Sequence, residues 1–149
     1  MFDLIVKGGS LPDGRVTDIG IRGDKIIAVE ALGEAEAGHV IDASGDLVSP
    51  PFVDPHFHLD ATLSYGQPRV NASGTLLEGI NLWGELRDLA TVDEMIERAL
   101  TYCDWAVSMG LLAIRSHVDT TPDHLNTVAA MVQVRDAVKD RIDLQLVAF

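Results

Sequence analysis

The first fifty residues carry short runs in which apolar and polar side chains alternate, with glycine, proline or aspartate between the runs. Alternation with a period of two is typical of strands that bury one face. The pair Gly23 and Asp24 between two such runs favours a tight hairpin. The pattern predicts a small β-sandwich-like unit over residues 1–50, with a loop at 31–38 and strands at 2–7, 16–22, 25–30, 40–42 and 47–49.

From residue 51 onward, extended apolar runs alternate with stretches of helical spacing. Thr91, followed by Glu94 three positions later, forms a capping-box pattern at the start of one helix. Residues 61–75 fit neither pattern and are expected to be a long loop. We predict strands leading into the segment 51–60 and over 111–118 and 143–149, and helices over 76–89, 91–109 and from Thr121 or Asp123 to about 139.

This order of strands and helices implies an α/β fold with a parallel sheet and right-handed crossovers. The run 111–118 is almost continuously apolar, which predicts a strand covered on both faces. Trp83 and Trp105 stand at helical spacing and are expected to be core residues.

Composition narrows the classes of function. The net charge is −12 with no cluster of lysine and arginine, which argues against nucleic acid and anionic membrane as partners. No apolar run approaches the roughly 20 residues of a membrane span. The single cysteine excludes an internal disulfide, and no secretory signal is visible. We therefore expect a cytoplasmic protein that acts on a small molecule.

The most informative segment contains His56 and His58, two positions apart. On an extended strand these side chains point to the same side, while Phe57 points to the other. Two converging imidazoles suit a divalent first-row metal ion. The alternative is a strand that carries two half-exposed histidines without a metal.

The His-x-His strand, the β-unit before it and the βα units after it resemble the metal-dependent amidohydrolase superfamily. Within that superfamily the chain looks most like the bacterial cytosine deaminase group. A (β/α)₈ barrel takes about 250 residues, so the resemblance implies an N-terminal fragment: a β-unit at 1–50 and about three strands of an incomplete TIM-type barrel at 51–149. The segments that carry the resemblance are 49–60, 66–68, 73–80, 114–119 and 142–149.

The resemblance also implies the chemistry of the site. His56 and His58 would hold one divalent metal ion, Fe²⁺ or Zn²⁺, while Leu76 and His117 would contact the substrate. The remaining metal ligands and the acid–base residue would lie beyond Phe149, so no catalytic residue is expected among these 149. For Leu76, a plain place in a helix core is an equally good interpretation.

The expected activity of the full-length protein is hydrolysis of cytosine, or a similar cyclic amidine, to the carbonyl compound and ammonia, with the fragment itself inactive. A second class of zinc-dependent nucleobase deaminases, which has a different fold, needs a Pro-Cys-x-x-Cys motif. A chain with one cysteine cannot supply this motif. The alternatives left open are a cyclic amide or triazine hydrolase of the same superfamily and a non-catalytic truncated chain. A homo-oligomer of the full-length enzyme is also left open.

Overall fold

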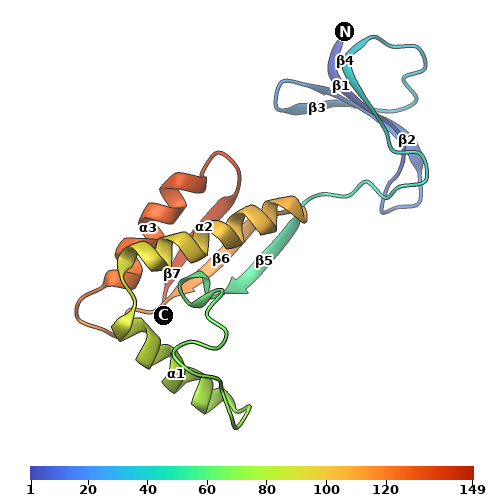
Figure 1. Ribbon diagram of the computed structural model, residues 1–149. Helices are drawn as coiled ribbons and strands as arrows, with labels where there is room; N and C mark the ends of the chain where they lie inside the picture. The colour runs from blue at the N-terminus through green and yellow to red at the C-terminus, as the bar shows by residue number, and fades with distance from the viewer. The chain divides into compact units, whose positions relative to one another are not determined.

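The computed structural model describes residues 1–149, and the chain divides into two compact units, Met1–Pro50 and Pro51–Phe149. The first unit is one four-stranded sheet with the strand order β3-β2-β1-β4 (Figure 1). Neighbouring strands are antiparallel, except that β1 and β4 are parallel. The strands are β1 (Phe2–Ser10), β2 (Val16–Arg22), β3 (Lys25–Val29) and β4 (Ala37–Asp42).

Two expectations for this unit are wrong. The strands form a single sheet and not a sandwich, and only Ile5, Ile19 and Ala43 are buried apolar residues. Alternation predicts that a strand has one covered face, but it does not say how many sheets the strands form. The expected strand at 47–49 is reduced to one isolated bridge from Leu47 to Ser10. Two prolines follow it, and proline has no N–H with which to extend a ladder.

The second unit is a three-stranded parallel sheet, β5-β6-β7, with two helices packed against one of its faces (Figure 1). The predicted elements over 76–89 and 111–118 are confirmed, and so is the capping box formed by Thr91 and Glu94. The elements are β5 (Phe52–Phe57), a 3₁₀ turn η1 (Leu59–Ala61), α1 (Leu76–Leu89), α2 (Val92–Ser108), β6 (Leu111–Val118), α3 (Asn126–Val138) and β7 (Asp143–Ala148).

The prediction that the central strand β6 is covered on both faces is wrong. Ile114, Ser116 and Val118 are buried beneath the helices, whereas Arg115 is exposed and His117 is only partly buried. A parallel sheet needs helices or further strands on its second face to be enclosed. Here α2 and α3 both lie on the same side, so the second face is open.

The core of this unit lies between the sheet and the helices α2 and α3. Met131 on α3 has no exposed surface, and Cys103 on α2 is 1% exposed. Burial raises the pKa of the Cys103 thiol to about 11. The other buried apolar residues of this core are Leu59, Met95, Ala99, Ala106, Ile114, Val118, Ala130, Val134, Val138, Ile142 and Leu144.

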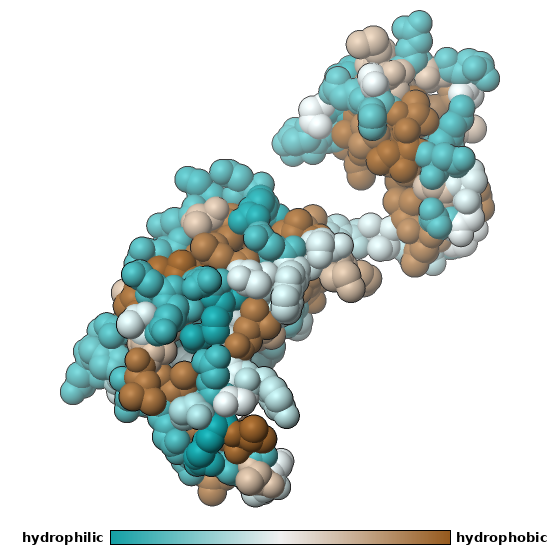
Figure 2. Space-filling view, in the orientation of Figure 1, coloured by the Kyte–Doolittle hydropathy of each residue, from teal (hydrophilic) through white to brown (hydrophobic).

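Helix α1 stands apart from this layer and buries only part of its apolar surface. Leu76 and Ile80 are exposed, while Leu82 and Leu86 are buried. Figure 2 shows hydrophobic surface over this part of the unit. Trp105 on α2 is 58% exposed, so its expected place in the core is also wrong.

Helix α3 begins at Asn126 and not at Thr121 or Asp123. Thr121 instead bonds to the carboxylate of Asp119, which keeps these residues in a turn. None of the helices combines the length and the apolar composition needed to cross a membrane.

Candidate metal centre

Strand β5 presents two imidazoles at its carboxyl end. The rings of His56 and His58 lie with their centroids 5.5 Å apart and their planes at 57°. Phe57 between them faces the helices, where its ring stacks on Tyr102 of α2 with centroids 4.4 Å apart. The aromatic contact therefore anchors the end of β5 to α2, directly beside the two imidazoles.

A third imidazole comes from the neighbouring strand. His117 lies at the carboxyl end of β6 and stacks on His56, with ring centroids 4.1 Å apart and planes at 24°. Its ring centroid is 5.8 Å from that of His58. Phe149 approaches His58 edge-on at 5.0 Å. The parallel sheet thus brings side chains from three strand ends into one aromatic cluster.

The donor geometry fits part of a metal site. Imidazole nitrogen lone pairs lie in the ring plane, so the stacked rings of His117 and His56 do not aim at a common point. Accordingly, no group of three or more His, Cys, Asp or Glu side chains is arranged to hold a metal ion. His56 and His58 have the donor chemistry for two ligands of zinc or iron. The Nδ1 atom of His117 is buried without a hydrogen-bond partner.

Hydrogen bonds join the turn after His58 to the end of β6. The Leu59 N–H donates to Ser116 Oγ at 2.9 Å, and the Asp119 N–H donates to Asp60 Oδ2 at 2.9 Å. Asp60 is 1% exposed, and its Oδ1 atom has no partner. Burial raises the pKa of the Asp60 carboxyl. These bonds fix the position of the end of β5 relative to the end of β6. They therefore fix the position of His56 and His58 relative to His117.

Asp119, which directly follows β6, is a heavily hydrogen-bonded carboxylate. It accepts hydrogen bonds from Trp83 Nε1 at 2.9 Å, Arg87 Nη1 at 2.6 Å and the Thr121 N–H at 2.9 Å, and from the Thr121 hydroxyl. Burial by itself would raise its pKa, but these donors outweigh burial and lower the pKa to about 2. Helical spacing predicts that Trp83 is a plain core residue, and so misses its bond to Asp119.

Leu76 is the first residue of α1, directly after the N-cap Thr75. Its side chain is 81% exposed, so the helix-core interpretation is wrong. The contact with substrate stays a prediction for this residue, as it does for His117.

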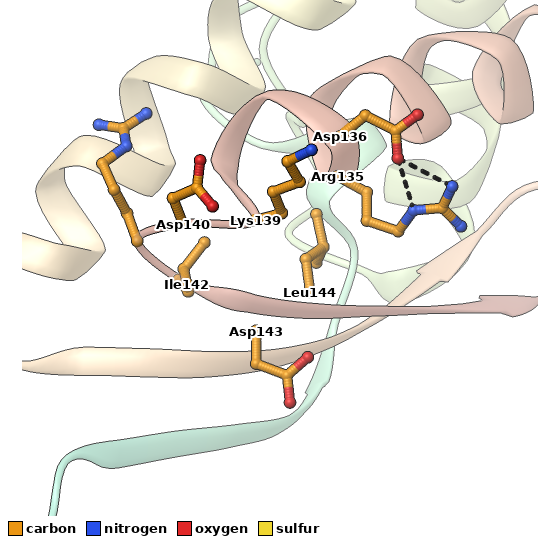
Figure 3. A pocket seen from close by; sticks show the side chains of 8 residues that line it. Arg135, Asp136, Lys139, Asp140, Ile142, Asp143 and Leu144 are labelled. Atoms are coloured by element: carbon orange, nitrogen blue, oxygen red, sulfur yellow. Dashed lines mark hydrogen bonds and ion pairs between the residues drawn. The ribbon is translucent and has the colours of Figure 1, made fainter. Parts of the chain in front are cut away.

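One hollow of this unit is remote from the histidines. It measures about 510 Å³ and lies where α3 ends and β7 begins, at the opposite end of the strands from the imidazoles. Figure 3 shows its lining, in which charged side chains of both signs alternate and Asp136 pairs with Arg135. It contains no histidine or cysteine, and its aspartates are not grouped so as to hold a metal ion.

Two imidazoles alone should bind zinc weakly. We expect titration of the 149-residue chain with Zn²⁺ in a calorimeter to give a dissociation constant above about 1 μM, because a catalytic zinc site ordinarily has three protein ligands. His56→Ala should weaken this binding further, and His39→Ala, on β4 of the other unit, should leave it unchanged. One-to-one binding at submicromolar concentration would contradict the half-site interpretation.

Comparisons with known proteins cover nearly the whole chain. A family model described as "Amidohydrolase family" matches residues 39–140. N-isopropylammelide isopropyl amidohydrolase of Pseudomonas sp. (strain ADP) is 34% identical in an alignment of 158 positions. The alignment covers 99% of this chain and 38% of that protein. The crystal structure of 5-methylcytosine deaminase from Klebsiella pneumoniae liganded with phosphonocytosine is 37% identical, with a TM-score of 0.88 over 97% of this chain and 36% of that one.

A third relative supports the fold alone. The structure of N-isopropylammelide isopropylaminohydrolase from Burkholderia multivorans is 24% identical, with a TM-score of 0.73 over 100% of this chain and 38% of that one. The chain therefore spans less than two fifths of the length of each of these relatives.

Proposed function

Because the chain belongs to the amidohydrolase family, we propose that it supplies two ligands of a divalent-metal site for hydrolytic deamination of a cyclic amidine. Cytosine and 5-methylcytosine are the substrates that we favour. The two units match the N-terminal part of amidohydrolase TIM-barrel enzymes. The proposal requires the remaining ligands and a proton-transfer group from outside these 149 residues.

One observation supports the proposal: the rings of His56 and His58 lie 5.5 Å apart at the carboxyl end of the parallel strand β5, with His58 one residue past the strand. Active sites of (β/α)₈ barrels lie at that end of the strands. The choice of a pyrimidine is supported by the 37% identity to 5-methylcytosine deaminase over 97% of the chain.

The residues of this chain have distinct roles in the proposed reaction. His56 and His58 would hold Fe²⁺ or Zn²⁺, and a bound ion of this kind lowers the pKa of water so that hydroxide is available near neutral pH. His117, stacked on His56, supplies an aromatic face and an unpaired Nδ1 atom beside the ligands, where a planar heterocycle would lie. The overall change adds water across the amidine C–N bond and releases ammonia, leaving a carbonyl group.

A second candidate is hydrolysis of an alkylamino-substituted triazine. It is favoured by the 34% identity to the Pseudomonas isopropylammelide enzyme over 99% of the chain. Both reactions displace an amine from a nitrogen heterocycle, so the same half-site serves either. They differ in the amine that leaves, ammonia or isopropylamine.

A substrate panel tests the two candidates together. The natural protein that includes this chain would be loaded with Zn²⁺ or Fe²⁺ and incubated with cytosine, 5-methylcytosine, N-isopropylammelide and hydantoin. We expect ammonia from the pyrimidines, with a kcat/KM at least about 100-fold above that for the other compounds, and one metal ion per chain. Isopropylamine as the main product would select the second candidate. Turnover of hydantoin alone, with two metal ions per chain, would contradict both.

A further inference from the structure

Helix α1 buries two of its leucines, Leu82 and Leu86, and leaves its other large aliphatic side chains exposed. It is not part of the layer that α2 and α3 form on the sheet (Figure 1). Its residues Leu76, Leu77, Ile80 and Leu89 are exposed. An amphipathic helix ordinarily packs against its neighbours through its apolar face. Because these four residues are exposed, they do not account for the placement of α1.

Besides the ion pairs of Arg69 in the preceding loop with Glu78 and Glu85, hydrogen bonds to Asp119 attach α1 to the end of β6. Trp83 and Arg87, one turn apart on α1, both donate to Asp119 Oδ2, at 2.9 and 2.6 Å. Arg87 also donates to the Thr121 hydroxyl at 3.1 Å. The side chains of Arg87 and Asp119 are 17% and 8% exposed, so their ion pair is largely shielded from water. A charge-assisted bond in such surroundings is stronger than one on the surface.

Asp119 also bonds to the 3₁₀ turn η1, which directly follows His58. The Asp119 N–H donates to Asp60 Oδ2, and Asp60 lies two residues after His58. The Thr127 hydroxyl of α3 donates to the Asp119 carbonyl oxygen at 2.5 Å. Asp119 is thus bonded through its carboxylate to α1, through its N–H to η1 and through its carbonyl oxygen to α3.

We propose that Asp119 is a positioning residue, which sets α1 and the residue at its start, Leu76, relative to His56 and His58. The structural part of this inference is independent of the reaction, and its consequence for substrate binding rests on the proposed function. Loss of the clamp, meaning the bonds of Trp83 and Arg87 to Asp119, leaves the two imidazoles in place but releases α1. The position of Leu76, the predicted substrate contact, is then no longer fixed.

Hydrogen exchange of α1 tests the clamp directly in the full chain. Arg87→Gln changes only the helix side, and Asp119→Asn keeps the N–H that bonds to Asp60. Both should speed exchange of the α1 amides about 10- to 100-fold, the effect of losing a hydrogen bond to a charged group. Arg87→Lys keeps a cation and should restore most of the protection. Asp104→Asn removes an exposed ion pair with Arg141 and should leave α1 unchanged.

A second readout tests the consequence for the reaction. In the natural protein, Arg87→Gln should lower kcat/KM by up to about 100-fold, mainly through KM, at unchanged metal content. Unchanged exchange of α1 in both Arg87→Gln and Asp119→Asn would overturn the clamp. A released α1 with unchanged kcat/KM would overturn its positioning role. An inactive wild-type protein would count against the proposed function, and the exchange data would then decide the clamp by themselves.

Discussion

Replacement of His58 by alanine in the natural protein should abolish metal binding and lower kcat by more than about 100-fold. Loss of an outer partner of a metal ligand typically costs 10–100-fold, and loss of a ligand should cost more. His58 and His56 are the two imidazoles whose rings, 5.5 Å apart, stand on the same side of β5 without being stacked. Metal content after dialysis and the initial rate of ammonia release measure the two effects.

Two matched variants distinguish a metal-ligating histidine from one that does not bind the metal. His117→Ala should retain the metal and raise KM, because the ring of His117 stacks on His56 and does not converge with it. His39→Ala should change neither quantity, since His39 lies on β4 in the other unit. Equal metal loss in His58→Ala and His117→Ala would mean that the third imidazole is also a ligand.

Replacement of Met131 by alanine should be the most destabilising apolar substitution in α3. The side chain has no exposed surface and packs in the core between α2, α3 and the sheet. Truncation of a buried methionine removes apolar contacts and leaves a cavity, which costs about 2–5 kcal/mol of unfolding free energy. Urea denaturation followed by circular dichroism should show a lower midpoint with an unchanged slope.

Met109 offers the control for this substitution. It is the C-cap of α2 and is 77% exposed, so Met109→Ala should change the unfolding free energy by no more than about 0.5 kcal/mol. If both variants lose the same stability, the helix layer is not the core of the unit.

The site could be predicted from the sequence only where the pattern is local. His56 and His58 share a face because a strand repeats every two residues, and this needs no knowledge of neighbours. The approach of His117 depends on the register in which Phe57 pairs with Ser116, 59 residues apart in sequence. No local pattern carries that register, so the stacking of His117 on His56 appears only in the structure.

The same limit explains the errors in the fold. Apolar spacing correctly places a helix at α1, but the competing apolar positions do not say which face is buried. The answer depends on Asp119, which draws Trp83 and Arg87 inward and leaves Leu76 outside. Likewise, alternation identified most of the strands of the first unit but did not say that they form a single sheet.

The burial of Cys103 has a practical consequence. The only thiol of the chain lies inside the helix layer and is protonated throughout the physiological pH range, because its pKa is about 11. Alkylating reagents attack the thiolate and need access to the sulfur. The rate at which a reagent such as iodoacetamide labels the chain therefore reports how often α2 separates from the core, and labelling in a cell extract would distinguish folded from unfolded molecules without purification.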